Sequence, residues 1–231
     1  MKRFLLKLSG EALANDSKKY DDEIIIGIAK QVKSLLDKGN QIGIVIGGGN
    51  YWRGRSSENI DRTKADQIGM LATIMNCIYV SEMFRSQGIG TEILTPFMCG
   101  SFTKLFSKDL AVESFQAGKV VFFAGGTGHP YFSTDTGVLL RAIEVDADGI
   151  YLAKAIDGVY DDDPRKNPNA KKYDTVSINE VIEKNLQVVD MTASVLARDN
   201  HMPMWVFDLT KENSILNAIG GNFDGTTVTA D

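Results

Sequence analysis

The sequence predicts an α/β fold, a three-layer αβα sandwich around a mostly parallel central sheet. Short apolar runs alternate along the chain with longer stretches in which apolar residues recur every three or four positions. This alternation is typical of parallel strands joined by helices that cover both faces of a sheet. The 231 residues, 43% of them hydrophobic, are enough for one large core, so we expect a single domain over residues 1–231.

The expected elements follow this rhythm from the N-terminus. Strands are predicted at 4–8, 41–46, 91–94, 119–124, 149–152 and 204–207, where short apolar runs are bounded by turn residues. A helix is predicted between the first two strands, with an apolar face through residues 24–36, a start at Asp21 or Asp22 and a stop at Gly39. A second apolar helical face runs through residues 68–83 and ends before Gly88.

Residues suited to binding an anion follow several of these strands. Ser9 and Gly10 follow the first strand, residues 47–50 (Gly-Gly-Gly-Asn) the second, residues 125–128 (Gly-Gly-Thr-Gly) the fourth, and Lys154 the fifth. Ligands of a parallel sheet bind beyond the carboxyl ends of its strands, and glycines expose peptide N–H groups to an anion. No common phosphate motif is present, and a glycine triplet alone also fits a tight strand-to-helix connection.

Charge and cysteine content argue against several classes of protein. A net charge of −5 is not typical of a general nucleic-acid or membrane-surface binder. Cys77 and Cys99 lack the spacing of metal ligands and are too few for a disulfide framework. Lys7 interrupts the first apolar run, so we expect neither a signal peptide nor a membrane span, and we expect a cytoplasmic protein.

Five segments carry a resemblance to bacterial uridylate (UMP) kinases of the amino-acid kinase superfamily. They are K-L-S-G-E-A-L at 7–13, G-G-G-N-Y-W-R-G at 47–54, D-Q-I-G-M-L-A-T-I-M-N at 66–76, G-T-G-H-P-Y-F-S-T-D at 126–135 and D-G-V-Y at 157–160. The first two indicate only the superfamily, whereas the third and fourth are far more specific. The resemblance extends from Lys7 nearly to the C-terminus.

This resemblance implies transfer of a phosphoryl group from ATP to UMP with Mg²⁺, in pyrimidine nucleotide biosynthesis. ATP and UMP are then the partners, and Mg²⁺ is expected mainly through the ATP phosphates, with no metal site made by side chains alone. The acceptor is already an anionic phosphate, so the reaction needs cations and backbone donors rather than a strong base. Members of the family form hexamers. The parts of the chain that bind UMP and ATP are not expected to be separate domains.

The resemblance implies three catalytic residues: Lys7, Arg53 and Asp190. Lys7 has the central electrostatic role at the β- and γ-phosphates, Arg53 clamps phosphate in a forked geometry, and Asp190 orients Lys7 or Mg²⁺-bound water. An edge-strand lysine, a surface ion pair and a helix cap are the alternative interpretations of these three residues. Arg55 and Arg62 fit surface ion pairs and are left without a role.

The ATP side is implied to include an aromatic face at Tyr160 and a polar acceptor at Asp163 for adenosine. Lys154 adds charge at the phosphates or lines the adenine pocket through its backbone. The acidic stretch around them also fits a solvated surface loop. The full set is Lys7, Leu8, Ser9, Gly10, Gly49, Arg53, Lys154, Tyr160 and Asp163.

The UMP side is implied to include Asp66, which accepts hydrogen bonds from the ribose hydroxyls. A carboxylate in the first turn of a helix explains Asp66 equally well. His129 is given a binding role only, and Asp135 is expected to cap the following helix. The full set is Gly48, Asp66, Thr127, Gly128, His129, Pro130, Tyr131, Phe132, Ser133 and Thr134.

Residues 14–20 depart from the glycine-rich stretch that bacterial uridylate kinases commonly have there, which argues against activation by GTP. The apolar face at 68–83 fits either a subunit contact or burial within the monomer. Two alternative functions remain at this stage: another small-molecule kinase of the superfamily, and a uridine-nucleotide sensor that binds without turnover. The presence of Lys7, Arg53 and Asp190 argues against the sensor.

Overall fold

The computed structural model describes residues 1–14, 18–52 and 59–231. Its strands are β1 (Arg3–Leu8), β2 (Gln41–Ile46), β3 (Thr91–Thr95), β4 (Lys104–Leu105), β5 (Val120–Phe123), β6 (Gly149–Lys154), β7 (Val159–Tyr160), β8 (Lys172–Tyr173), β9 (Thr175–Ser177), β10 (Met204–Asp208) and β11 (Gly225–Thr229). Its helices are the 3₁₀ turn η1 (Gly10–Leu13), α1 (Asp22–Asp37), α2 (Arg62–Ser86), α3 (Lys108–Gln116), α4 (Thr134–Glu144), α5 (Ile178–Glu183), α6 (Met191–Asp199) and α7 (Ser214–Gly220).

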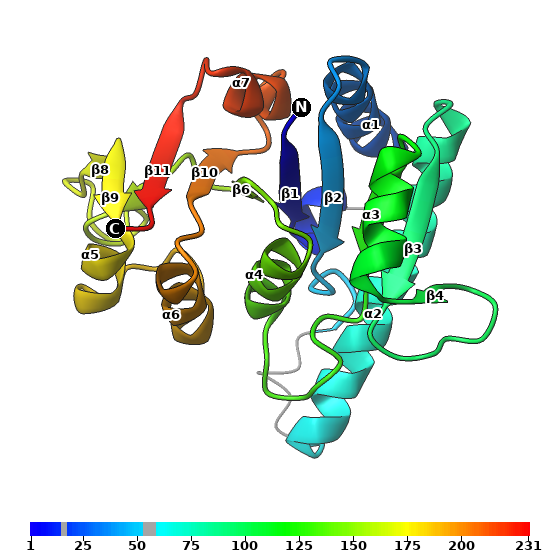
Figure 1. The fold of residues 1–231 in the computed structure, drawn as a ribbon. Coiled ribbons are helices and arrows are strands. Elements are labelled where there is room, and N and C mark those ends of the chain that lie inside the picture. The colour runs from blue at the N-terminus through cyan, green and yellow to red at the C-terminus, as the bar shows by residue number, and fades with distance from the viewer. Residues whose placement is uncertain (15–17, 53–58) are drawn as a thin grey trace.

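These elements form the predicted α/β sandwich. Nine strands make one sheet in the order β4-β3-β5-β2-β1-β6-β10-β11-β9, and helices cover both of its faces (Figure 1). Within this sheet the pairings are parallel except between β10 and β11. β7 and β8 pair antiparallel in a separate two-stranded sheet. All six predicted strands form, as β1, β2, β3, β5, β6 and β10. The remaining strands are short or mostly polar, which explains why they lack an apolar signal.

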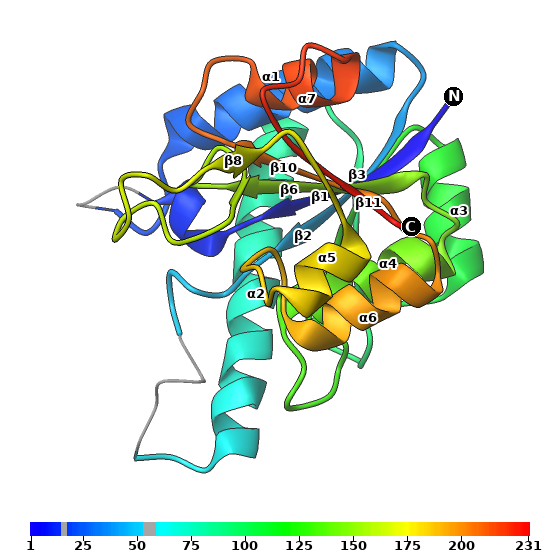
Figure 2. The ribbon, with the colours of Figure 1, turned by 90° about the vertical axis from the view of Figure 1, so that its left-hand side faces the viewer.

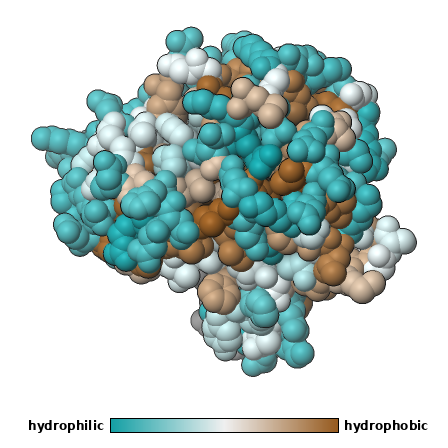
Figure 3. Space-filling model, viewed as in Figure 1, coloured by the Kyte–Doolittle hydropathy of each residue, from teal (hydrophilic) through white to brown (hydrophobic). Residues whose placement is uncertain are grey.

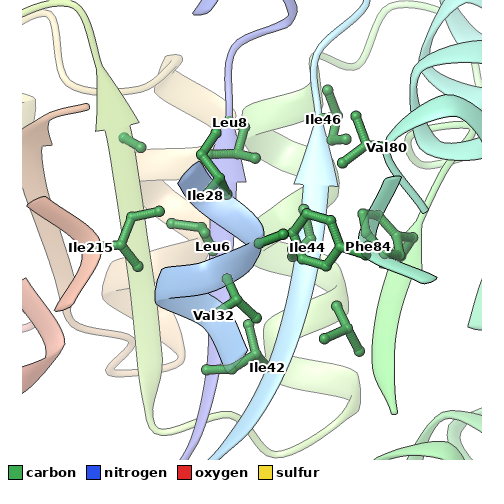
Figure 4. Packing of buried hydrophobic residues seen from close by; sticks show 14 of the residues in the cluster. Leu6, Leu8, Ile28, Val32, Ile42, Ile44, Ile46, Val80, Phe84 and Ile215 are labelled. Atoms are coloured by element: carbon green, nitrogen blue, oxygen red, sulfur yellow. The ribbon is translucent and has the colours of Figure 1, made fainter. Parts of the chain in front are cut away.

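The core lies in two layers because successive residues of a strand point to opposite faces of the sheet. On one face, Leu6 and Leu8 pack with Ile28 of α1, Phe84 of α2 and Ile215 of α7 (Figure 4). On the other face, alternate strand residues pack against α3, α4, α5 and α6. Each fully buried leucine or isoleucine contributes about 1.5–3 kcal/mol. These two layers hold the central strands in place beneath the candidate site.

Helix α1 confirms its predicted signals. The Asp21 carboxylate accepts hydrogen bonds from the backbone N–H groups of Glu23 and Ile24, and Gly39 follows the helix with a φ of 81°. A positive φ suits glycine, which has no Cβ to clash with the backbone. The helix therefore begins and ends where the sequence predicts.

Helix α2 is long and only partly packed against the sheet. It extends past the body of the fold (Figure 2). Ala72, Cys77 and Phe84 are buried, whereas Leu71 and Met75 are 51% and 45% exposed. The apolar face predicted at residues 68–83 is thus largely outside the core of the monomer.

The face of the molecule in Figure 3 is mainly hydrophilic, with hydrophobic residues visible between the polar ones. Among the described residues, no helix combines the length and the apolar character that crossing a membrane requires.

Candidate active site

The carboxyl ends of the central strands meet at one edge of the sheet, as the sequence predicts. The parallel register places Leu8 of β1 beside Ile46 of β2 and Ala153 of β6, so the turns that begin at Ser9 and Gly47 are neighbours. A cavity of about 330 Å³ opens at this edge. Its lining includes Lys7, Ser9, Gly10, Gly47, Gly48, Gly49, Asp66, Thr127, Phe132, Ser133 and Thr134. Leu8 is instead fully buried in the core.

The turn after β2 needs glycines at residues 48 and 49 because neighbouring atoms leave little room for a side chain there. A Cβ on Gly48 would lie 2.9 Å from the Gly69 carbonyl oxygen and 3.0 Å from the Ala72 Cβ, both on α2. A Cβ on Gly49 would lie 3.3 Å from a carboxylate oxygen of Glu11. Any side chain at Gly48 would therefore push the turn away from α2 and change the floor of the cavity.

Lys7 forms an ion pair that the sequence interpretation missed. Its Nζ lies 2.9 Å from Oδ1 of Asp135, and the two side chains are only 13% and 20% exposed. Asp135 does not cap α4, so that prediction was wrong. The cap is Ser133, whose hydroxyl oxygen accepts hydrogen bonds from the N–H groups of Asp135 and Thr136. Asp135 lies in the first turn, from which its carboxylate reaches Lys7.

Asp190 connects the beginnings of two helices. Its carboxylate accepts hydrogen bonds from the hydroxyls of Ser133 and Thr136, and from the backbone N–H of Ala193, which makes it the cap of α6. The capping interpretation is thus confirmed. Lys7 itself is paired with Asp135. The action of Asp190 on Lys7 or on Mg²⁺-bound water stays a prediction.

Lys154 ends β6 next to this pair. Its ammonium group donates a hydrogen bond to the Val188 carbonyl. Burial lowers the pKa of Lys154 below its usual value; the Asp135 charge opposes this shift, and the Lys7 charge adds to it. Lys7, Asp135 and Lys154 therefore form one electrostatic unit at the carboxyl edge.

Asp66 connects α2 to the segment after β5. Its Oδ2 accepts hydrogen bonds from Nε of Arg62 and from the backbone N–H of Tyr131, both at 2.8 Å. The Arg62 guanidinium also lies 5.3 Å from the centre of the Tyr131 ring. Within the described part of the chain, Oδ1 of Asp66 has no hydrogen-bond partner, which leaves it able to accept one from a ligand.

The segment 127–134 lies only partly against the cavity. Thr127, Phe132, Ser133 and Thr134 line it, whereas His129 lines an adjacent apolar pocket of about 420 Å³. Residues 128, 130 and 131 line neither of the two. Gly128 was expected to let the backbone approach a ligand. Its close neighbour is instead Pro96, whose Cβ would lie 2.9 Å from a Cβ added at residue 128.

A second pocket of about 540 Å³ lies between β6, β7 and the segment after α5. It is lined by Tyr160 and Asp163, which were expected to contact adenosine, and by Lys154, which was expected at the ATP phosphates or in the adenine pocket. The Tyr160 hydroxyl donates a hydrogen bond of 2.8 Å to the Asp157 carboxylate. The acidic stretch is therefore a pocket wall and not only a solvated loop.

The model of the amino acid kinase family matches residues 2–208 of this chain. The chain belongs to the amino acid kinase family.

Proteins similar to this chain over nearly its whole length are named uridylate kinase or UMP kinase. A uridylate kinase of Mycoplasmopsis pulmonis is 44% identical over 233 residues, which cover 98% of this chain and 96% of that protein. The crystal structure of a UMP kinase from Ureaplasma parvum has a TM-score of 0.94 at 34% identity and covers 99% of this chain and 98% of its own. That of a UMP kinase from Bacillus anthracis has a TM-score of 0.95 at 36% identity, with coverages of 100% and 96%.

Arg53 and Arg55 lie outside the described residues. Sequence reasoning named Asp135 and Arg62 but missed that Asp135 pairs with Lys7 and that Arg62 lines the cavity. A serine two positions before Asp135 is a good cap, which could have placed Asp135 inside the first turn. Arg62 forms an ion pair, as expected. Its partner is Asp66, a residue of the site that lies four positions later on α2.

Proposed function

We propose that this protein is a uridylate kinase, which transfers the γ-phosphoryl group of ATP to UMP and releases ADP and UDP. The observation that carries the proposal is a single cavity lined both by Lys7 and by Asp66, whose Oδ2 is engaged by Arg62 and Tyr131 while its Oδ1 is open to a ligand. Relatives named uridylate kinase cover nearly the whole chain and support it. We place the reaction in pyrimidine nucleotide biosynthesis in the cytoplasm.

The proposed chemistry depends on charge and positioning. An oxygen of the UMP phosphate attacks the γ-phosphorus, and the bond from that phosphorus to the bridging oxygen of ADP breaks. The Lys7 and Lys154 ammonium groups offset the negative charge of the phosphates. The N-terminus of α4, at Ser133 and Thr134, offers backbone N–H groups to an anion. No side chain needs to remove a proton, because the acceptor phosphate is already ionised.

Mg²⁺ is proposed to enter with the ATP phosphates. Among the described residues, no group of three histidine, cysteine or acidic side chains is arranged to hold a metal ion. Asp135 and Asp190 are the carboxylates at the start of α4 and α6, and their contacts are with Lys7 and with hydroxyl and N–H groups. A phosphate-bound ion therefore fits this chain better than a resident one. Such an ion supplies positive charge to the phosphates.

The function is tested by ADP release with UMP, CMP, acetylglutamate and glutamate as acceptors, with and without Mg²⁺. We expect UMP to give by far the highest kcat/KM, and omission of Mg²⁺ to abolish it. A preference for acetylglutamate or glutamate would identify another kinase of the family. Binding of UMP without turnover in the presence of ATP and Mg²⁺ would identify a sensor.

Replacing Asp66 with asparagine is expected to raise the KM for UMP by about 10-fold and to leave the KM for ATP nearly unchanged. Asparagine weakens the acceptor proposed for the ribose and removes the charge that holds Arg62. Steady-state kinetics with each substrate varied in turn measures the effect. Asp61→Asn is the control, since Asp61 caps the same helix and asparagine also caps well. Equal effects on both substrates would contradict the ribose role.

The KM for ATP is expected to rise at alkaline pH because of Lys154. Its pKa is lowered, so it loses its proton, and its attraction for phosphate, below the ordinary lysine pKa of 10.5. Lys154→Met should raise the KM for ATP near pH 7 and flatten its dependence on pH. Lys184→Met is the control: Lys184 lines the same second pocket, but its Glu180 partner raises its pKa. A pH dependence that survives in Lys154→Met would contradict this role.

We propose a homohexamer, in which α2 makes part of the contact between subunits. Ile68, Leu71, Met75 and Ile78 follow each other at spacings of three and four, and each is 37–51% exposed. An apolar stripe of this kind on one helix is suited to a second copy of the chain. Leu71→Glu is expected to lower the molar mass measured by light scattering, whereas Lys64→Glu, on the same helix, should leave it unchanged.

A further inference from the structure

The motif at residues 66–76 contains two buried polar residues that the proposed chemistry does not use. Thr73 and Asn76 are 3% and 0% exposed and lie on α2. Burying a polar side chain is costly unless its hydrogen-bonding groups find partners. Both residues form hydrogen bonds to turns that line the cavity.

Asn76 is bonded to the glycine turn after β2. Its amide nitrogen donates to the Gly47 carbonyl at 2.7 Å and to Oδ1 of Asn50 at 2.8 Å. Its amide oxygen accepts from Nδ2 of Asn50 at 3.1 Å and from the Tyr20 hydroxyl at 2.8 Å. The side chain of Asn76 thus has its donors and its acceptor in use, and both ends of the turn 47–50 are attached to α2.

The turn after β1 packs on the same group of side chains. A Cβ on Gly10 would lie 2.4 Å from the Gly47 carbonyl oxygen, 2.5 Å from Oδ1 of Asn50 and 3.1 Å from Nδ2 of Asn76. The Ser9-Gly10 turn and the glycine turn therefore share one buried anchor. A shift of Asn76 would displace both turns.

Thr73 is bonded to the turn after β5. Its hydroxyl oxygen accepts a hydrogen bond from the Gly125 N–H at 2.8 Å and donates one to the Met70 carbonyl at 2.7 Å. Gly125 has a φ of 79° and begins the segment that leads to Thr127 and the start of α4. Thr73 thus attaches the acceptor side of the cavity to α2.

We infer that Thr73 and Asn76 are positioning residues that set the distance between the two sides of the cavity. They lie three residues apart on one helix, so their Cα atoms are separated by about 4.5 Å along its axis. One rigid helix then fixes the turns after β1 and β2 relative to the turn after β5. A misplacement of about 1 Å between reacting groups can reduce a rate about 100-fold, so such a spacer matters for transfer.

This inference rests on the proposed function, and its test separates the two. Wild-type turnover of UMP is measured first. We then expect Thr73→Val, which keeps the shape but removes the hydroxyl, to raise the KM for UMP about 5-fold or more and the KM for ATP less than 2-fold. Thr73→Ser, which keeps the hydroxyl, should have a KM for UMP close to that of the wild type.

The Asn76 anchor should show the opposite preference, because the two turns it holds carry three residues of the ATP side (Ser9, Gly10 and Gly49) and one of the UMP side (Gly48). Asn76→Ser is expected to lower kcat and to raise the KM for ATP more than the KM for UMP. Tyr20→Phe removes a single hydrogen bond to Asn76 and is a milder variant that should fold; we expect the same pattern with a smaller size. Ser81→Ala is the matched control, because it removes a buried hydroxyl of α2 that bonds to Thr91, away from the cavity.

Equal changes in the two KM values, or a lower Tm with unchanged kinetics as in Ser81→Ala, would overturn the positioning role. If the wild type does not phosphorylate UMP, the proposed function fails and calorimetric binding of UMP and of ATP to the same variants replaces the kinetics. The expected split in affinity then supports the positioning role, and its absence rejects it.

Discussion

Replacing Lys7 with methionine is expected to lower kcat for phosphoryl transfer by about 10²–10³-fold. Lys7 is the next-to-last residue of β1, lines the cavity and is held there by Asp135, so its ammonium group is in place before the nucleotides arrive. Methionine keeps much of the aliphatic length but removes the charge that offsets the charge on the phosphates. Single-turnover measurement of UDP formation checks the result, because it separates transfer from product release.

Lys104→Met is the matched control for Lys7→Met. Lys104 forms an ion pair of the same N–O distance, 2.9 Å, with Glu92, whose side chain is 12% exposed. The pair belongs to β3 and β4 and does not line the cavity. Lys104→Met should therefore be somewhat less stable than the wild type, because it loses an ion pair, and its kcat should be nearly unchanged. A similar kcat for Lys7→Met and wild type would contradict the assignment of Lys7.

Replacing Asp135 with asparagine is expected to lower kcat by about 10–100-fold, because the Lys7 ammonium loses the carboxylate that holds it. The Asp135 charge also raises the pKa of Lys154, so its removal should lower that pKa further. The alkaline rise in the KM for ATP should then begin at a lower pH in Asp135→Asn than in the wild type. A pH profile of kcat and of the KM for ATP measures both effects.

A double-mutant cycle shows whether Lys7 and Asp135 act together. If Asp135 acts by holding Lys7, adding Asp135→Asn to Lys7→Met should reduce kcat by less than it does in the wild-type background. Fully additive losses would mean that Asp135 affects transfer by a separate route. Thermal unfolding of the three variants shows how much of each loss comes from a destabilised fold.

The structure agrees with the sequence most closely where the signal is local. The six predicted strands are apolar runs beside turn residues, and α1 has a capping aspartate and a terminal glycine, so neighbours in the sequence are enough to specify them. β11 pairs antiparallel with β10 although its sequence is mostly glycine and threonine. Its stability comes from a partner strand, which the local pattern does not contain.

The site was predicted less completely than the fold. The strand-end turns could be located because a parallel sheet brings its carboxyl ends together. Asp66 could be located because its segment resembles that of uridylate kinases. The partner of Lys7 could not be located, because the two residues are far apart in the sequence and capping explained Asp135 equally well. The burial of Leu8 was also missed, since a residue in a binding motif can face the core.

The local sequence pattern is enough to specify strands that alternate with helices, with glycines and hydroxyl residues after the strands and lysines near their ends. These properties depend on periodicity and on the conformations that single residues allow. Only the tertiary structure decided that Asp135 holds Lys7, that one oxygen of Asp66 is engaged by α2 and the segment after β5, and that Thr73 and Asn76 anchor the turns. The reason is physical: these bonds join side chains from different elements, and their geometry exists only after the sheet and α2 have packed.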